Sequence, residues 1–517
     1  MTFRKGPARK RLASLSTSAL EGMLRGVEKE SLRVAPDGTL SRGPHPAALG
    51  SALTHPAITT DFSEAQLELI TGVHRTADDC RAELNWLHRG TVRAIGDELL
   101  WAASMPGDLP AEHEIPIAAY GRSNPGLAKT VYRVGLGHRY GRRMQTICGV
   151  HYNWSLPGLG SDDYLALIRN FRRAAFLPIY LFGASPAVRA GFVDGSSHGL
   201  QPMAAQTLWQ PYATSLRMSR LGYRNDAQAG LAVSFNSLGG YADSLREALM
   251  RPHAPYQAIG LRDADGGYRQ LSTALLQLEN EFYGTVRPKR RTAPNERPLH
   301  ALLARGIEYV EVRCLDLDPF DPLGVPATTM RFLDTLLLHC LLADSPPDAP
   351  AESAALARNQ ERVAARGREP GLRLECGLSE VGLAQWGRHL LDECAQLASA
   401  LDALHGGDDY RAAIECAREA LANPARLPSA RVAESVGRDF GGSYAAFALA
   451  RSRIAAARLR GAAWTRDDAQ RFQALASQSQ RAQQAVEAAD DRPFDDYRRQ
   501  LVALDTPPNT VAREAVG

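Results

Sequence analysis

Residues 305–316 read Arg-Gly-Ile-Glu-Tyr-Val-Glu-Val-Arg-Cys-Leu-Asp, and this stretch decides the fold. Read as a strand, its successive side chains point to opposite faces of a sheet. Tyr309, Glu311 and Arg313 then share one face, and two valines share the other. A buried strand seldom carries a carboxylate and a guanidinium unless each is paired or binds a ligand. The stretch indicates either a salt-bridged edge strand or a strand that lines a site, with Glu311 for a cation and Arg313 for an anion.

A second candidate strand, residues 26–34, places Glu28 and Glu30 on one face. The Pro-Asp-Gly sequence that follows is a turn signal and predicts a hairpin. Two carboxylates on one strand face repel each other unless a cation lies between them. The alternative is a solvated face on which Lys29 and Arg33 balance the charge.

Residues 59–71, Thr-Thr-Asp-Phe-Ser-Glu-Ala-Gln-Leu-Glu-Leu-Ile-Thr, add Asp61 and Glu68 to the carboxylates. Glu64 and Glu68 are four residues apart, which would also suit one face of a helix. The flanking threonines, the short run and the alternation of polar with apolar side chains favour a strand.

A further strand is predicted over residues 144–155, where His151, Asn153 and Ser155 share a face. A lone histidine in a strand is more often a hydrogen-bonded core residue than a ligand. The carboxylates on the other predicted strands shift the balance towards a ligand.

Composition limits the function classes. The chain has 517 residues, 44% hydrophobic and 23% charged, with a net charge of +3, which is too balanced to indicate nucleic-acid or anionic-membrane binding. Seven scattered cysteines without a Cys-x-x-Cys pair indicate reduced thiols and a cytoplasmic setting. No apolar run reaches the roughly 18–20 residues that span a bilayer, and the basic N-terminus lacks the apolar core of a secretory signal.

The domain organisation follows from composition shifts. We expect a basic N-terminal tail over residues 1–14, for which an organelle transit peptide is the alternative, and a catalytic sheet with helices over 15–345. A proline-rich break precedes an alanine- and arginine-rich helical region over 346–505, expected to pack on the catalytic part. Residues 506–517 are expected to be a disordered tail.

The predicted strands together carry five carboxylates and one imidazole, at Glu28, Glu30, Asp61, Glu68, Glu311 and His151. Oxygen-rich ligands with one imidazole suit Mg²⁺ or Mn²⁺ better than zinc. With Arg313 and the basic run at 287–291, they provide what phosphoryl transfer from ATP requires. The chain has neither a Walker P-loop nor a dinucleotide-binding glycine fingerprint. A structural network of ion pairs remains the alternative.

Six segments in order resemble the proteobacterial glutamate–cysteine ligases, which begin glutathione synthesis. The resemblance extends from about residue 24 to about 343 and continues more weakly through 367–372. The segments are GVEKESLRV (26–34), THPAITTDFSEAQLELIT (54–71), QTICGVHYNWS (145–155), YATSLRMSRLGY (212–223), LENEFYGTVRPKR (278–290) and GIEYVEVRCLD (306–316).

The resemblance implies an α+β fold, with a glutamine-synthetase-like antiparallel sheet that forms an open funnel surrounded by helices. It implies that ATP phosphorylates the γ-carboxylate of glutamate and that the cysteine amine attacks the acyl phosphate. Glu28, Glu30, Asp61, Glu68, His151 and Glu311 match the family's metal ligands. Arg313 and Glu311 match its catalytic residues, with Arg313 over the transferring phosphoryl group.

The same resemblance implies the substrate contacts. Lys289 and Arg290 match nucleotide contacts, and Arg217 is expected to bind the carboxylate of cysteine. Lys29 and Ser31 stand where close relatives often carry arginine and threonine. The full set of expected cysteine-pocket residues is Tyr132, Leu136, Gln145, Arg217, Tyr223 and Tyr283.

Two other functions stay open from the sequence. One is a related ATP-dependent carboxylate–amine ligase that uses another amine, and the other is a non-catalytic nucleotide-binding protein. The expected partners are glutamate, cysteine and ATP, with Mg²⁺ (or Mn²⁺) and without nucleic acid or membrane. The oligomeric state is open, a monomer being one outcome.

Overall fold

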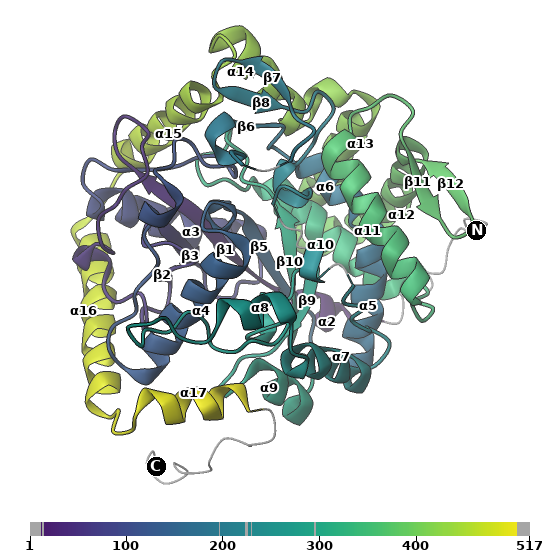
Figure 1. The fold of residues 1–517 in the computed structure, drawn as a ribbon. Helices are drawn as coiled ribbons and strands as arrows, with labels where there is room; N and C mark the ends of the chain where they lie inside the picture. Colours follow the sequence, from purple (N-terminus) through teal and green to yellow (C-terminus); the bar gives the residue numbers. More distant parts are fainter. Residues whose placement is uncertain are drawn as a thin grey trace.

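The stretch that opens the sequence analysis forms β10 (Tyr309–Leu315), a strand of the central sheet. A computed structural model describes residues 12, 15–195, 197–222, 226–228, 230–293 and 296–503. Within these residues the sheet has seven strands in the order β2-β3-β1-β5-β10-β9, with β4 also paired to β1, and every pair is antiparallel (Figure 1). The other strands are β1 (Leu24–Val34), β2 (Ile58–Thr60), β3 (Gln66–Ile70), β4 (Leu99–Leu100), β5 (Val150–Ser155) and β9 (Val286–Lys289).

The described part of the sheet does not close into a barrel, because β2 and β9 each pair with a single neighbour. This confirms the predicted open antiparallel sheet. Pro288 lies in β9, where its missing N–H is tolerated because β9 is an edge strand. The segment predicted as one strand over 59–71 forms two antiparallel strands, β2 and β3, with Asp61 in the turn between them. Glu68 lies in β3, so the helical alternative is wrong.

Helices surround the sheet. The first half of the chain gives α2 (Thr17–Glu21), α3 (Ala77–Ala94), α4 (Asn124–Tyr140), α5 (Ser161–Ala174), α6 (Phe176–Phe182), α7 (Leu238–Met250) and α8 (Ala254–Ile259). The second half gives α9 (Pro298–Arg305), α10 (Ala327–Leu342), α11 (Pro350–Arg366), α12 (Leu383–His405), α13 (Asp409–Ala422), α14 (Pro428–Asp439), α15 (Tyr444–Gly461), α16 (Arg466–Ala488) and α17 (Phe494–Val502). Short 3₁₀ turns near the sheet are η3 (Met144–Thr146), η5 (Leu216–Met218), η6 (Asp226–Gln228) and η7 (Glu279–Glu281).

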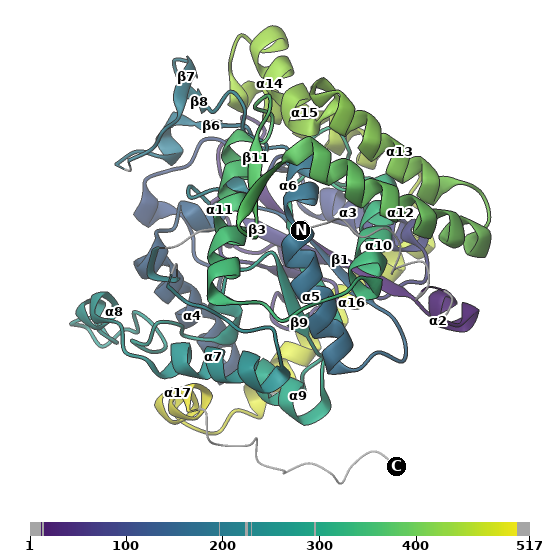
Figure 2. The ribbon, with the colours of Figure 1, turned by 90° about the vertical axis from the view of Figure 1, so that its right-hand side faces the viewer.

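The two faces of the sheet differ. Val27, Val310 and Val312 are fully buried on the face that α3, α5 and α10 cover. Figure 2 shows α5 and α10 on that side, whereas α4 and α8 lie across the opposite side in Figure 1. Period-two alternation therefore buries the valines under helices and turns the carboxylates towards α4.

The helix α4 is held at both ends by its own sequence. The Ser123 hydroxyl accepts a hydrogen bond from the backbone N–H of Gly126, and Pro125 occupies the first turn, where its missing N–H costs nothing. Gly141 ends the helix with a positive φ of 82°, a conformation that glycine adopts without strain. The result is a fixed wall opposite the polar face of the sheet.

The C-terminal helices return to the N-terminal half of the chain. Ser452 on α15 accepts from the backbone N–H of Ala102, and Ser479 on α16 accepts from that of Ser51, both at 2.9 Å. Figure 1 shows α16 and α17 running along the edge of the molecule beside β2 and α4. Two small additional sheets are β6 (Ala187–Arg189) with β8 (Thr207–Trp209) and β7 (Gln201–Ala204), and the hairpin of β11 (Arg373–Cys376) with β12 (Ser379–Gly382).

The expected N-terminal tail, Leu12 excepted, and the expected tail at 506–517 lie outside the described residues. All seven cysteines are free thiols, six of them buried and Cys416 exposed. Across the described ranges, no helix is both long and apolar enough to cross a membrane.

Candidate active site

Strand register brings most of the predicted ligands onto one face of the sheet. Glu28 lies opposite His151, and Glu30 lies opposite Glu68. Glu311 lies opposite Asn153 on the adjacent strand. Side chains opposite each other on antiparallel strands have Cβ atoms roughly 5 Å apart, so charged groups from four strands converge.

Glu28, His151 and Glu311 form the first cluster. One ligand atom from each lies within 4.8 Å of the other two. The Nδ1 atom of His151 is 3.2 Å from Oε2 of Glu28 and 3.6 Å from Oε1 of Glu311. The buried Oε2 of Glu311 and Nε2 of His151 have no hydrogen-bond partner among the described residues. Buried polar atoms normally have partners, so these two atoms are available to a ligand.

The charges of this cluster are fixed by its surroundings. Burial opposes ionisation of Glu311, but the Arg313 and Lys289 charges outweigh it and hold its pKa well below its usual range. Burial and the nearby Arg313 charge lower the pKa of His151, which favours the neutral imidazole that ligates metals. Burial and the Glu311 charge oppose ionisation of Glu28, but the His151 hydrogen bond and Lys289 lower its pKa overall.

We call Glu30, Glu68 and Asp61 the second cluster, because Glu30 lies opposite Glu68 in the sheet and both carboxylates feel the Asp61 charge; among the described residues, only the first cluster has its ligand atoms within 4.8 Å of one another. Burial first, and then the Asp61 charge, raise the pKa of Glu30 to about 8. Burial and three neighbouring carboxylates raise the pKa of Glu68 well above its usual range. Such shifts are expected where like charges crowd together, and a bound cation would relieve them. Arg133 on α4 donates to the backbone carbonyl of Asp61 and fixes the loop that carries it.

Cations lie along the other side of the first cluster. Arg313 Nη1 donates to Glu311 Oε1 at 2.9 Å, and Lys289 Nζ lies 3.5 Å from the same oxygen. The register of β10 against β5 shifts between Val312 and Leu315, a bulge that follows the Glu311–Asn153 pair. Arg290, by contrast, donates to the carbonyls of Arg305 and Gly306, away from the carboxylate clusters.

Arg217 on η5 is buried beside the clusters. Its Nη2 atom donates to the carbonyl of Arg313 at 2.9 Å. The guanidinium lies directly against Gly149, where an added Cβ would be 2.1 Å from Nη2. The backbone N–H of Gly149 in turn donates to Glu30 at 2.7 Å. Glycine at this position therefore allows Arg217 to approach the Glu30 strand closely.

The expected cysteine-pocket residues that the structure describes come from four segments, one of which is η5 with Arg217. Tyr132 and Leu136 lie one turn apart on α4, Gln145 lies on η3, and Tyr283 follows η7. Gln145 Nε2 donates to the Tyr283 hydroxyl at 3.2 Å, which joins two of these segments directly. Tyr223, the sixth expected residue, lies outside the described residues.

Sequence reasoning named no individual role for three residues near the site. Asn153 donates to Glu28 at 2.9 Å, and its shared face with His151 was the signal. Arg287 lies opposite Glu311 on β9, within the basic run that was identified. Lys129 on α4 gave no sequence signal; its side chain is exposed to solvent and lies near enough to Glu68 to interact with that carboxylate's charge.

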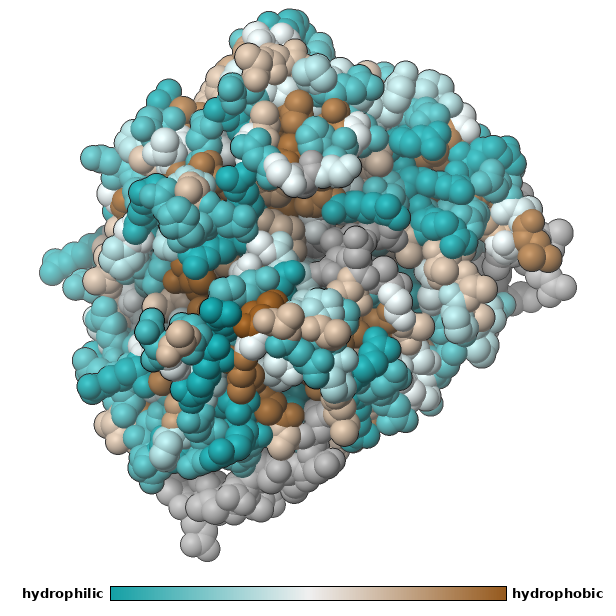
Figure 3. Space-filling view, viewed as in Figure 1, coloured by the Kyte–Doolittle hydropathy of each residue, from teal (hydrophilic) through white to brown (hydrophobic). Residues whose placement is uncertain are grey.

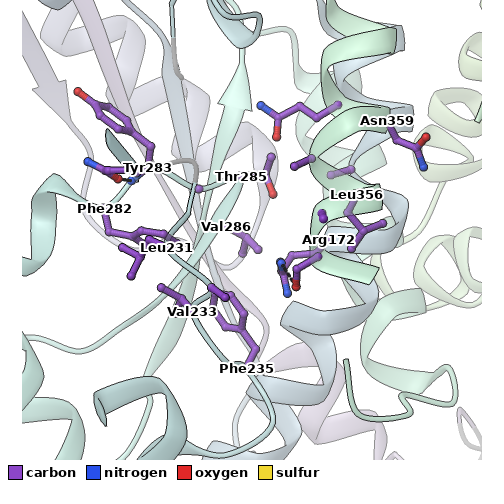
Figure 4. Close-up of a pocket in the computed structure, with 18 of the residues that line it drawn as sticks. Arg172, Leu231, Val233, Phe235, Phe282, Tyr283, Thr285, Val286, Leu356 and Asn359 are labelled. Carbon is purple, nitrogen blue, oxygen red and sulfur yellow. Dashed lines mark hydrogen bonds between the residues drawn. The ribbon is translucent and has the colours of Figure 1, made fainter. Parts of the chain in front are cut away.

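A cavity of about 580 Å³ lies beyond the turn that carries Tyr283 (Figure 4). Two of the arginines that line it are paired, Arg172 with Asp348 and Arg173 with Glu352. It is bordered by β9 and α11 instead of by the carboxylate clusters. On the face seen in Figure 3, most of the surface is hydrophilic, and hydrophobic side chains lie in separate patches, several of them around the middle.

Comparison with known proteins identifies the family of the chain. The sequence model of the glutamate–cysteine ligase family matches residues 10–363. A glutamate–cysteine ligase of Azotobacter vinelandii is 47% identical over 94% of this chain and 96% of its own length. One from Saccharophagus degradans is 44% identical over 94% of this chain and 95% of its own length.

Solved structures show the same relationship. The glutamate–cysteine ligase of Francisella tularensis in complex with AMP is 35% identical, with a TM-score of 0.88, over 93% of this chain and 97% of that chain. A bifunctional glutathione synthetase from Pasteurella multocida is 25% identical, with a TM-score of 0.68, over 87% of this chain and 55% of that chain. The chain therefore belongs to the glutamate–cysteine ligase family.

Proposed function

We propose that the polar face of the central sheet is where this chain performs the reaction of its family. That reaction is the ATP-dependent joining of the γ-carboxylate of glutamate to the amine of cysteine, which gives γ-glutamylcysteine, the first step of glutathione synthesis. The observation that carries the proposal is the convergence of Glu28, His151 and Glu311 within 4.8 Å, beside the second carboxylate cluster.

The donor set fits divalent cations. Two clusters supply carboxylate oxygens and one neutral imidazole, the ligands that suit Mg²⁺ and Mn²⁺. Oε2 of Glu311 and Nε2 of His151 are buried and make no hydrogen bond among the described residues, although Nε2 lies 3.7 Å from Oε1 of Glu30. Burial and the charges of Glu28, Asp61 and Glu30 raise the pKa of Glu68. A bound cation would satisfy these groups. Mg²⁺ held by Glu28, His151, Glu311, Glu30, Glu68 and Asp61 would neutralise phosphate charge and polarise the phosphoryl group.

The protein's own residues would do the remaining work by position and charge. We place Arg313 over the transferring phosphoryl group, because its guanidinium is anchored by Glu311 at the edge of the first cluster. Lys289 would contact the nucleotide phosphates from the neighbouring strand. Arg290 is a weaker nucleotide contact, because its guanidinium is engaged with backbone carbonyls.

The chemistry proceeds in two displacements. A γ-carboxylate oxygen of glutamate attacks the terminal phosphorus of ATP, and the bond from that phosphorus to ADP breaks. The neutral amine of cysteine then attacks the acyl carbon, and phosphate leaves as the C–N bond forms and the amine loses a proton. Activation is needed because a carboxylate is a poor electrophile, whereas an acyl phosphate has a good leaving group.

The amine would bind between α4, η3 and the turn after η7. Tyr132, Leu136, Gln145 and Tyr283 would form its walls, with Tyr223 completing the pocket and Arg217 paired with the amino-acid carboxylate. Every proposed group comes from one chain, so a monomer would suffice. The buried free thiols support a reducing, cytoplasmic setting.

The test is Mg²⁺-dependent ADP release from ATP and glutamate, with and without cysteine, and with the product identified by mass. Release that requires cysteine and yields γ-glutamylcysteine is the expected result. Release with another amine but not with cysteine would indicate a related carboxylate–amine ligase. No release with any amine, from folded protein that binds ATP, would indicate a nucleotide-binding protein without this activity.

A further inference from the structure

A buried ionic network joins the two walls of the proposed amine pocket from behind. One wall is α4, which carries Tyr132 and Leu136, and the other is the turn around η7, which leads to Tyr283. Between them lie the side chains of Arg139 and Glu281, both fully buried and 2.9 Å apart. None of the residues expected to bind substrate supplies this link.

Glu281 is the centre of the network. Its Oε1 atom accepts from Arg139 Nη1 at 2.9 Å and from the Tyr140 hydroxyl at 2.5 Å. Its Oε2 atom accepts from the backbone N–H of Gln277 at 2.6 Å. Arg139 and Tyr140 lie three and four residues beyond Leu136, so they follow it along the same side of α4. The carboxylate therefore fixes the helix against the η7 turn.

A second connection runs from Glu281 to Tyr283. Gln228 Nε2 donates to the carbonyl of Glu281 at 2.9 Å, and Gln228 Oε1 accepts from the backbone N–H of Tyr283 at 3.1 Å. The ring of Tyr140 also meets that of Tyr283 edge to face, with centroids 6.0 Å apart. The Tyr283 backbone and ring are thus each held by a residue that contacts Glu281.

The other wall is held through Gln277. Its Nε2 atom donates to the carbonyl of Tyr132 at 3.2 Å. Gly135 leaves the space for this side chain, since an added Cβ there would lie 2.3 Å from Gln277 Oε1. The backbone of Gln277 is the group that donates to Glu281. Tyr132 and Tyr283 are therefore both connected to one buried carboxylate.

We propose that Glu281 is a positioning residue that sets the spacing between Tyr132 and Tyr283, and so the affinity for the amine substrate. The inference rests on the proposed function, because it assumes that these tyrosines contact cysteine. Buried ionic groups can fix one arrangement of the surrounding segments while contributing little net stability to the protein. Removal of one partner of such a pair is strongly destabilising, because the other partner is then buried without compensation.

The chain offers a matched control in Asp334 on α10. Its fully buried carboxylate also accepts from an arginine and from tyrosines: from Arg25 Nε at 3.2 Å, from Tyr152 at 2.8 Å and from Tyr410 at 3.3 Å. The helix that carries Asp334, α10, lies on the helix-covered side of the sheet, away from α4 (Figure 2). Loss of the Asp334 charge should affect folding in the same way without touching the pocket.

The experiment compares full-length Glu281→Gln and Asp334→Asn enzymes by ADP release. Three donors face Glu281, so the amide of glutamine must oppose a donor with a donor while the volume stays the same. We expect Glu281→Gln to raise the KM for cysteine about tenfold and to leave the KM values for ATP and glutamate within twofold. Asp334→Asn should lower Tm and leave all three KM values within twofold.

Three outcomes would overturn the inference: a cysteine KM unchanged in Glu281→Gln, an equal rise in all three KM values, or the same cysteine-specific rise in Asp334→Asn. If Glu281→Gln does not fold, Tyr140→Phe removes one hydrogen bond and keeps the ring against Tyr283. That variant should raise the cysteine KM about threefold, and an unchanged value would equally overturn the inference. Failure of the proposed function is distinct, because the wild-type enzyme would then show no cysteine-dependent ADP release.

Discussion

Replacement of Glu311 is the most demanding mutational test of the first cluster and of the proposed phosphoryl site beside it. Its Oε1 atom lies 2.9 Å from Arg313, 3.5 Å from Lys289 and 3.6 Å from His151. Two unit charges about 4 Å apart interact by about 4 kcal/mol at an effective dielectric constant of about 20. Glutamine keeps the shape of the side chain but removes the charge, so one attraction of this size, between Glu311 and the cations that surround the proposed phosphoryl site, is lost.

We expect Glu311→Gln to lower kcat about a thousandfold, since about 4 kcal/mol of transition-state stabilisation corresponds to three powers of ten. The assay is cysteine-dependent ADP release at saturating ATP, glutamate and Mg²⁺. Glu308→Gln is the control, because Glu308 precedes the strand and pairs with Arg291 at 2.8 Å away from the clusters. It should keep activity within twofold. A folded Glu311→Gln enzyme with more than a tenth of the wild-type kcat would refute the reasoning.

Three further predictions follow from single contacts. Arg217→Ala should raise the KM for cysteine at least ten times more than the KM for ATP. The control Arg220→Ala, at an exposed position on the same turn, should alter neither KM. Equal effects of Arg217→Ala on both KM values would argue against Arg217 in the amine pocket. Gly149→Ala should lower Tm and turnover, because overpacking costs about 1–3 kcal/mol and the added Cβ would lie 2.1 Å from Arg217; unchanged kinetics would show that this close approach is dispensable. Burial, and then the His389 charge, lower the pKa of His339 to about 4. Its contribution to stability is therefore present above the unfolded pKa of 6.5 and is lost as the pH falls towards 4. Between pH 7 and pH 5 the wild type should lose about 2 kcal/mol more unfolding free energy than His339→Gln, and parallel losses would contradict the buried neutral imidazole.

The strands and their polar faces could be predicted because alternation is a local property. The side chains two residues away in the sequence indicate which sheet face carries Glu28, His151 and Glu311. The order of the strands is different, since β1 lies between β3 and β5 through packing that no single segment encodes. The sequence spacing alone does not predict that Glu28, His151 and Glu311 lie within 4.8 Å of one another. That expectation comes from the family resemblance.

Contacts between residues that are far apart in the sequence are harder to predict from the sequence. The basic run at 287–291 divides: Arg287 and Lys289 pair across the strand with Glu311 and Tyr309, whereas Arg290 turns to the loop before β10. The strand ends at Lys289, so alternation no longer decides where the next side chain points. The Glu281 network could not be predicted at all, because its members are separated by up to about 140 residues and meet only in the folded chain.

The most direct test of the central claim is where divalent cations bind. Crystals grown with Mn²⁺ and a non-hydrolysable ATP analogue would reveal the ions by anomalous diffraction. The account predicts Mn²⁺ between Glu28, His151 and Glu311, and Mn²⁺ beside Glu30 and Glu68, with the analogue's phosphates next to Arg313. A nucleotide bound elsewhere, or carboxylates that remain paired only with arginine, lysine and histidine while Mn²⁺ is absent from this face, would contradict it.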